Sequence, residues 1–259
     1  VVRFPLDRSE KLAQRFRYEA RLLAGLKHPL IVPLIDFFER SGRPFLVMEY
    51  AQGNSLSQSL ATTGPYSAVA AAAMIEQIAD AVEYVHERRS PDGRELIHRD
   101  LKPGHVIVQP DGVPRLIDFG LASYREAAGG TPSTNHHGTL EYMSPEQARA
   151  FLGQPSCVDR RADVWALGTI LFELLTAQRL FGNRPNRDMF ASTAEWSEAI
   201  IKYLGPRTSA DDAALARSTG NPSHGSLDQI IARCVAKHPE ARYQTAGELA
   251  GALRAWRTG

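Results

Sequence analysis

The segment that most constrains the fold of this chain is residues 96–120, where short β-prone runs are separated by turn-forming residues. Residues 106–108 and 115–117 are mostly apolar, and the Gln-Pro-Asp-Gly sequence between them is typical of a tight turn. The sequence therefore predicts a β-hairpin. Because Asp100 precedes this hairpin and Asp118 follows it, the two carboxylates are expected at adjacent ends of one small ribbon.

The composition indicates a globular chain. It has 259 residues, of which 43% are hydrophobic, enough to bury a large core in one large domain or two lobes. The formal net charge of +1 gives no electrostatic reason to expect nucleic acid or an anionic membrane as a partner. Cys157 and Cys234 are too few for a disulfide framework, so both are predicted to be buried apolar side chains in a reducing, cytoplasmic compartment.

The most apolar run, residues 68–85, is interrupted by Glu76, Asp80 and Glu83. Charged side chains are costly in a bilayer, so this run predicts a helix of a soluble domain with no membrane contact. The chain begins with Val1 in place of an initiator Met, which favours a segment cut from a longer protein. A membrane anchor elsewhere in that protein stays an open alternative, and the sequence predicts no oligomeric state.

The hairpin and its flanking tripeptides resemble the catalytic loop and metal-binding segment of eukaryotic-type protein kinases, H-R-D-L followed by D-F-G. In that family the first Asp accepts the proton of the substrate hydroxyl and the second holds magnesium on the ATP phosphates. The resemblance implies these roles for Asp100 and Asp118. It also implies that Lys102 contacts the transferred phosphate, as in the Ser/Thr branch of the family. The order and spacing of the motifs disfavour the alternative of chance tripeptides in an ordinary α/β protein.

Two positions depart from the family pattern. His105 stands where the family has an Asn that ligates the second metal ion, and Arg3, in a Val-Val-Arg-Phe run that resembles strand V-A-I-K, stands where the family has Lys. Imidazole prefers softer ions than magnesium, so manganese is a possible second choice of cofactor at His105. The family's Gly-rich loop has no counterpart, because no Gly precedes Gly25.

The resemblance implies five nucleotide-binding residues. Glu19 lies in residues 9–26, whose apolar spacing predicts a helix similar to the kinase αC helix, and an Arg3–Glu19 ion pair is implied there. The alternative for Arg3 is an exposed arginine on a strand, and the alternative for Glu19 is a solvated carboxylate on a helix. Farther on, Met48 would line the back of the adenine pocket, and the backbones of Glu49 and Ala51 would meet the adenine edge.

Other segments extend the resemblance over nearly the whole chain. Residues 66–88 have the apolar spacing of a long helix, and residues 31–38 and 44–50 alternate as two strands. By resemblance, Asp163 hydrogen-bonds the backbone of the catalytic loop. Residues 144–146, Ser-Pro-Glu, resemble the end of the family's activation loop. By that resemblance, Glu146 is expected to pair with Arg242 near the C-terminus.

The predicted fold class is α+β, the two-lobed protein kinase fold. Residues 1–50 are expected to form a truncated, small β-rich lobe, and residues 51–259 a mainly helical large lobe. The predicted function is phosphoryl transfer from magnesium-ATP to Ser or Thr hydroxyls of a protein substrate. The alternative is a catalytically impaired pseudokinase that acts as a signalling or interaction module, because Arg3 and His105 depart from the pattern. Small-molecule phosphotransfer is less favoured.

Overall fold

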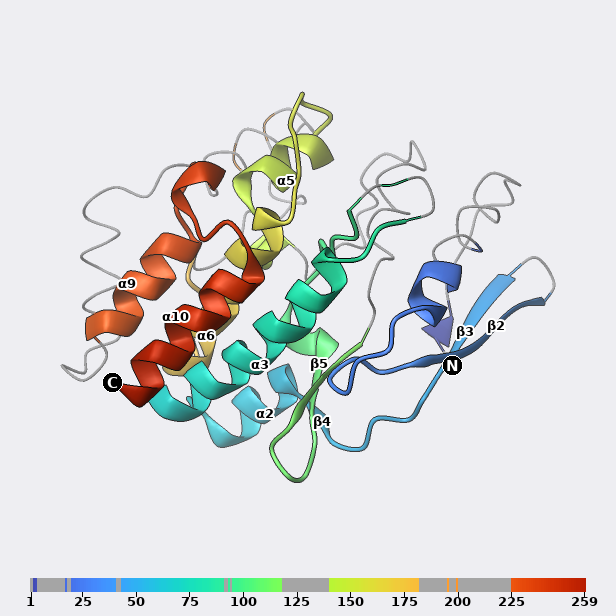
Figure 1. Ribbon diagram of the computed structural model, residues 1–259, viewed down its shortest axis with the longest axis horizontal. Helices are drawn as coiled ribbons and strands as arrows, with labels where there is room; N and C mark the ends of the chain where they lie inside the picture. The colour runs from blue at the N-terminus through green and yellow to red at the C-terminus, as the bar shows by residue number, and fades with distance from the viewer. Residues whose placement is uncertain are drawn as a thin grey trace.

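The computed structural model describes residues 2–3, 17, 20–40, 43–90, 93, 95–117, 140–181, 195, 199 and 225–259. A small part rich in β-strands comes from the first fifty residues, and a larger part is mostly helical (Figure 1). This confirms the predicted α+β class. The boundary between residues 50 and 51 stays a prediction.

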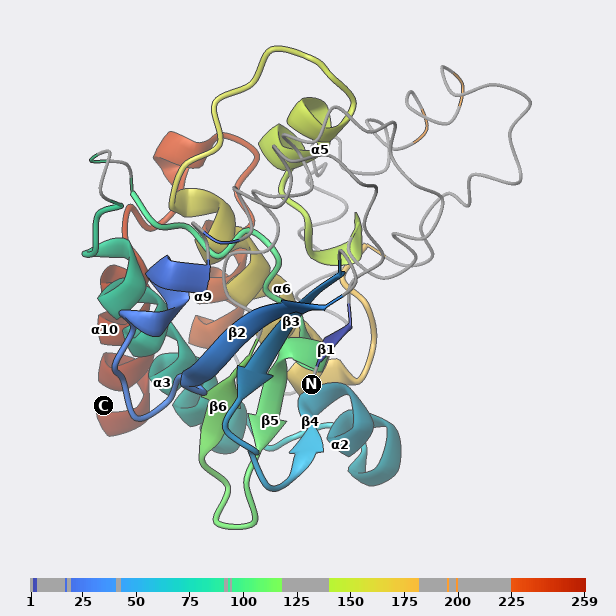
Figure 2. The same cartoon turned by 90° about the vertical axis from the view of Figure 1, so that its right-hand side faces the viewer.

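The small part is a three-stranded antiparallel sheet. Its strands are β1 (Val2–Arg3), β2 (Leu34–Arg40) and β3 (Arg43–Met48), in the order β1-β3-β2 (Figure 2). Leu46 of β3 is buried, and Phe38 stacks on Phe45 with ring centroids 5.2 Å apart, a cross-strand pair that stabilises the register. All three strands were predicted, although β2 begins three residues later than expected.

The helix predicted for residues 9–26 is described only in part. Residues 17 and 20–24 are helical, and Ala20 is buried. The segment then passes through Ile31, which bridges to Leu116 in the large part. This parallel bridge is reinforced by the Val32 amide donating to the Leu116 carbonyl at 2.9 Å. The start of β2 is therefore anchored to the predicted hairpin.

The predicted hairpin is present. Strands β5 (Val106–Val108) and β6 (Pro114–Leu116) pair antiparallel, and β4 (Asn54–Ser55) adds a third strand beside β5. Gly112 has φ of 85°, a left-handed turn conformation that glycine adopts without steric cost. Strand β6 begins one residue before the predicted position. Val106 and Leu116 face each other and are buried, so the ribbon is fixed on the core.

The larger part is built on helices that bury apolar side chains. They are α2 (Leu56–Thr63), α3 (Ala68–His86), α5 (Pro145–Phe151), α6 (Arg161–Thr176), α9 (Gly225–Cys234) and α10 (Ala246–Thr258). Helix α3 confirms the prediction for residues 66–88, and α10 packs along it (Figure 1). Short 3-10 turns add η1 (Pro103–His105), η2 (Leu140–Tyr142) and η5 (Pro239–Ala241). No helix among the described residues has the length and apolar character needed to cross a membrane.

Helix α6 is the centre of the core, because nearly every side chain along it is buried. At Gly168 it approaches α9 so closely that an added Cβ atom would collide with the Cβ of Cys234. Cys234 is buried, as predicted. The prediction for Cys157 was wrong. Cys157 is exposed because it lies in the connection between α5 and α6, and connections run over the surface.

Candidate active site

The backbone before Asp100 is held by one buried carboxylate. Asp163, in the first turn of α6, accepts hydrogen bonds from the backbone amides of His98 and Arg99, both at 2.8 Å. His86, at the end of α3, lies 2.7 Å from the same carboxylate through Nε2. Burial raises the pKa of Asp163, but the hydrogen bond and charge of His86 outweigh it and keep the pKa below its usual value. The predicted contact between Asp163 and the catalytic loop is confirmed.

Arg99 has φ of 64°, a left-handed conformation that is strained for a residue with a Cβ atom. Its N–H is bound by Asp163, and its carbonyl accepts a hydrogen bond of 2.8 Å from Nε2 of Gln147. Such strain costs about 1–3 kcal/mol and persists only where the surroundings enforce it. Here Asp163 of α6 binds the N–H of Arg99 and Gln147 of α5 binds its carbonyl, so the peptide groups on both sides of this residue are held and the direction of the next residue, Asp100, is fixed.

The sequence prediction missed Gln147. Ser144 and Gln147 form a capping box at the start of α5. The Ser144 hydroxyl accepts a hydrogen bond from the backbone N–H of Gln147, and the side-chain Oε1 of Gln147 accepts one from the backbone N–H of Ser144. The Ser-Pro-Glu-Gln spacing could have indicated this cap. The spacing could not have shown that the side-chain Nε2 of Gln147 donates to the carbonyl of Arg99.

Asp100, Lys102 and His105 meet in one small cluster. Nζ of Lys102 donates to Oδ2 of Asp100 at 3.0 Å, and Nδ1 of His105 donates to the backbone carbonyl of Asp100 at 2.8 Å. The turn η1, which begins with Pro103, brings residue 105 back towards residue 100. Burial raises the pKa of Asp100, but the nearby His105 and Lys102 lower it below its usual value. Asp100 is therefore a carboxylate at neutral pH.

The second carboxylate oxygen of Asp100, Oδ1, is buried and has no hydrogen-bond partner within the described part of the chain. The side chain as a whole is 11% exposed. A buried acceptor without a partner is costly, so such positions are concentrated at functional sites. An ionised carboxylate of this kind can accept the proton of an incoming hydroxyl group.

Several predicted site residues fall outside the described residues. Asp118 and Glu19 are among them, and of Arg3 only the backbone is described, opposite Phe45 in the sheet. Their roles, including the Arg3–Glu19 ion pair, stay predictions. The structure does place Ile117, the residue before Asp118, because its amide donates to the His105 carbonyl at 2.9 Å.

The predicted adenine-binding segment follows β3. Met48 is half-buried at the end of the strand, and the Glu49 amide donates to the Pro33 carbonyl at 3.0 Å. Within the described residues, the Ala51 N–H makes no hydrogen bond, so it is a candidate donor for a ligand. The Glu49 carboxylate forms an ion pair with Arg115 of β6, a link between the two parts of the molecule that the sequence did not indicate.

The predicted pair of Glu146 and Arg242 is confirmed. Both side chains are buried, and the guanidinium contacts the carboxylate through two hydrogen bonds of 2.6 and 2.9 Å. This bidentate pair fastens the end of the predicted activation segment to the C-terminal part of the core.

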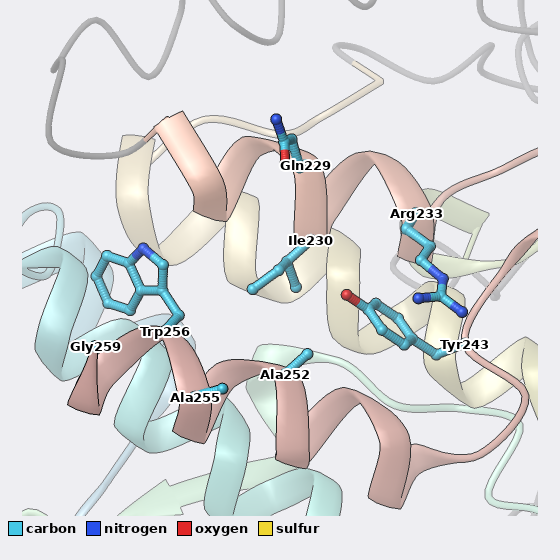
Figure 3. A pocket seen from close by; sticks show the side chains of 8 residues that line it. All are labelled: Gln229, Ile230, Arg233, Tyr243, Ala252, Ala255, Trp256 and Gly259. Carbon is cyan, nitrogen blue, oxygen red and sulfur yellow. The ribbon is translucent and has the colours of Figure 1, made fainter.

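A separate hollow of about 600 Å³ lies between α9 and α10 (Figure 3). Arg233 and Tyr243 close one end, with the guanidinium carbon 4.1 Å from the ring centroid, and Trp256 lies at the other end. None of its lining residues belongs to the catalytic loop or to the segment after β3. The hollow is therefore distinct from the candidate active site.

The family implies a metal ion, and the cluster offers part of a suitable donor set. Within the described ranges, no group of three or more His, Cys, Asp or Glu side chains is arranged to hold a metal ion. Asp118 as a metal ligand, together with oxygen atoms of the nucleotide phosphates, therefore stays a prediction. Among the described residues, the backbone carbonyl of His105 accepts a hydrogen bond from Ile117, the residue before Asp118.

The fold and this loop define a protein kinase domain. Residues 4–251 match the family model described as the protein kinase domain, so the chain belongs to that family. This confirms the resemblance stated from the motifs.

Two similar curated proteins are bacterial kinases. The chain is 30% identical over 250 residues to the serine/threonine-protein kinase PrkC of Bacillus subtilis, and 32% identical over 256 residues to the serine/threonine-protein kinase PknB of Mycobacterium tuberculosis. Each alignment covers 96% of this chain but only 34% and 37% of the relative. The chain thus spans about a third of the length of these relatives.

Solved structures support the fold. The crystal structure of the Mycobacterium tuberculosis PknI kinase domain matches with a TM-score of 0.64 and 22% sequence identity. That match covers 96% of this chain and 80% of the crystallised chain.

Proposed function

We propose that this domain transfers the terminal phosphoryl group of ATP to serine or threonine hydroxyls of a protein substrate. One observation carries the proposal. The Asp100 carboxylate is ionised, and one of its oxygens accepts a hydrogen bond from Lys102. The other oxygen has no hydrogen-bond partner within the described residues. The loop that carries Asp100 is held by the hydrogen bond from Arg99 N–H to Asp163. Protein kinases need a general base in this state, held by a rigid support.

Each residue of the cluster has a defined task. Asp100 accepts the hydrogen bond of the substrate hydroxyl and orients its oxygen towards the phosphorus atom. Lys102, 3.0 Å from Asp100, places a positive charge where the transferred phosphoryl group passes. A bound magnesium ion would neutralise part of the phosphate charge, and Asp118 and His105 would hold this ion.

The nucleotide is assigned to the segment after β3. The N–H of Ala51 and the carbonyl of Glu49 are the donor and the acceptor proposed for the adenine edge, and Met48 is proposed to line the back of the pocket. Arg3 and Glu19 are proposed to align the phosphates. Relatives that are named serine/threonine-protein kinases support serine and threonine as the acceptors.

The test is phosphoryl transfer from labelled ATP to a basic test protein, with magnesium or with manganese, followed by identification of the modified amino acid. Asp100→Asn removes the base while it keeps the size of the side chain, so the rate should fall by about 100-fold or more. Nucleotide affinity should be retained. If both forms bind nucleotide and neither transfers phosphate with either metal, the proposal fails and the pseudokinase alternative gains support.

A further inference from the structure

The segment between β3 and β4 begins and ends on the same small sheet. At its start, the Glu49 carboxylate forms an ion pair with Arg115 of β6. At its end, Ser55 of β4 pairs with Ile107 of β5, and Arg115 pairs with Ile107 from the other side. Both ends of the segment are therefore fastened to one row of residues across the sheet β4-β5-β6, and the residues between them form a closed loop.

The end of this loop is fixed by main-chain contacts. Gly53 has φ of 137°, and a Cβ atom added there would collide with the carbonyl oxygen of Val108 in β5. Glycine tolerates both this backbone angle and this contact because it has no Cβ atom. The next residue, Asn54, pairs with Val108 in the ladder between β4 and β5. This end of the loop therefore needs no side chain to hold it.

The start of the loop depends on the side chain of Arg115. This side chain is only 14% exposed, and its Nε is buried without a hydrogen-bond partner in the described part of the chain. Glu49 supplies the carboxylate that compensates the mostly buried guanidinium, and removal of one partner from such a pair is costly. The next residue of β6, Leu116, is bonded through its N–H to the Leu30 carbonyl and through its carbonyl to the Val32 N–H. Arg115 is therefore a rigid anchor for Glu49.

We propose that the Glu49–Arg115 ion pair positions the nucleotide-binding segment, because it closes the loop of residues 49–55 and so directs the N–H of Ala51 towards the adenine edge. The inference rests on the proposed function, which assigns the adenine to this segment. A loop that is open at its start must be ordered when the nucleotide binds, and this ordering lowers the affinity. Arg115 and the Glu49 carboxylate act through the backbone and are positioning residues.

Three changes isolate the ion pair. Glu49→Gln removes the charge and keeps the size of the side chain, and Arg115→Met removes the guanidinium and keeps an extended side chain. The double variant Glu49→Arg with Arg115→Glu exchanges the two charges and rebuilds the pair in the opposite sense. Glu39→Gln is the matched control, because Glu39 of β2 also forms an ion pair, with Arg17, and its side chain is similarly exposed.

The experiment measures the affinity of each variant for adenosine by isothermal titration calorimetry. Adenosine carries no phosphate, so its binding needs neither a metal ion nor phosphoryl transfer. The affinity should fall roughly fivefold in Glu49→Gln and in Arg115→Met, recover in the exchanged double variant and stay unchanged in Glu39→Gln. The KM for ATP should rise by a similar factor with a smaller change in kcat, because the pair acts on binding of the nucleotide and not on Asp100.

Equal adenosine affinity in the unmodified chain and in both single variants would overturn the inference and leave the kinase proposal standing. Losses that add in the double variant Glu49→Gln with Arg115→Met would also overturn it, because the two groups would then act separately. The expected pattern of adenosine binding without phosphoryl transfer from ATP would support the inference and overturn the proposed function. If the unmodified chain binds neither adenosine nor ATP, both proposals fail.

Discussion

Arg242 and Glu146 form a bidentate ion pair inside the protein, between residues 96 positions apart in the chain. The same guanidinium donates to the carbonyls of Ala236 and Arg161 and lies 4.9 Å from the ring centroid of Trp165. One side chain thus joins α5, α6 and the segment before α10. Because both charges are buried, each depends on the other for compensation.

Arg242→Met should lower the free energy of unfolding by about 3–5 kcal/mol, because it leaves the Glu146 carboxylate buried without its partner. Urea denaturation followed by circular dichroism measures the change. The double variant with Glu146→Leu should lose much less than the sum of the two single changes. Additive losses would mean that the two groups are not coupled.

Stability should depend on pH through His98. Burial lowers the pKa of His98 to about 4, from a usual value of 6.5, despite the opposing effect of Asp163. The unfolded chain therefore binds a proton between pH 6.5 and 4 that the folded chain does not. The free energy of unfolding should fall across that window as the pH drops, by up to about 3 kcal/mol from this residue.

Denaturation curves at several pH values provide the test for His98. His98→Phe, which cannot be protonated, should flatten the dependence between pH 6.5 and 4. His238→Phe, at an exposed position, serves as the control and should leave the slope unchanged. An equally steep slope in His98→Phe would assign the proton uptake to other groups.

Gly168→Ala should destabilise the core by about 1–3 kcal/mol, because its methyl group would collide with Cys234 of α9. Gly251 is the matched control. It lies in α10, and a Cβ atom there meets nothing within 4 Å, so Gly251→Ala should stabilise by about 0.5–1 kcal/mol. Thermal melts of the two variants should shift in opposite directions. A shift in the same direction would contradict the packing at Gly168.

Gln147→Leu should reduce kcat about tenfold and leave the KM for ATP nearly unchanged, because it releases the Arg99 carbonyl that positions Asp100. Ser144→Ala is the comparison, since it removes the side-chain cap of α5 but keeps the Gln147 contact with Arg99. That variant should lose about 1 kcal/mol of stability with little change in kcat. If Gln147→Leu and Ser144→Ala had similar kcat values, Gln147 would act only as a capping residue of α5.

The combined Arg3→Lys and His105→Asn variant should transfer phosphate in magnesium roughly 100-fold faster than the unmodified chain. Each restored contact contributes about 1.4 kcal/mol or more to binding the transition state, and each 1.4 kcal/mol is tenfold in rate. Steady-state rates of both single variants and the double variant give the comparison. An unmodified chain that already matches the double variant would show that the two positions are misassigned.

Much of the fold could be predicted from local pattern. The turn residues before Gly112 indicated the hairpin, and apolar spacing indicated α3, because pairing in a hairpin and the buried face of a helix depend on residues near in sequence. The resemblance to protein kinases also implied the contacts of Asp163 and Arg242. Cys157 was misplaced because residue type alone does not show where a connecting segment runs.

The sequence by itself pointed to the groups that we propose for the chemistry, namely the carboxylate of Asp100 and the departures from the family pattern at Arg3 and His105. The family resemblance implied that Asp163 contacts the loop, but only the tertiary structure showed the strained backbone of Arg99 and the second contact, from Gln147. The left-handed backbone of Arg99 is enforced by Asp163 and Gln147, which lie 64 and 48 residues away. Neither contact follows from a periodic pattern, because a hydrogen bond between distant segments exists only after α5 and α6 have packed on the same core.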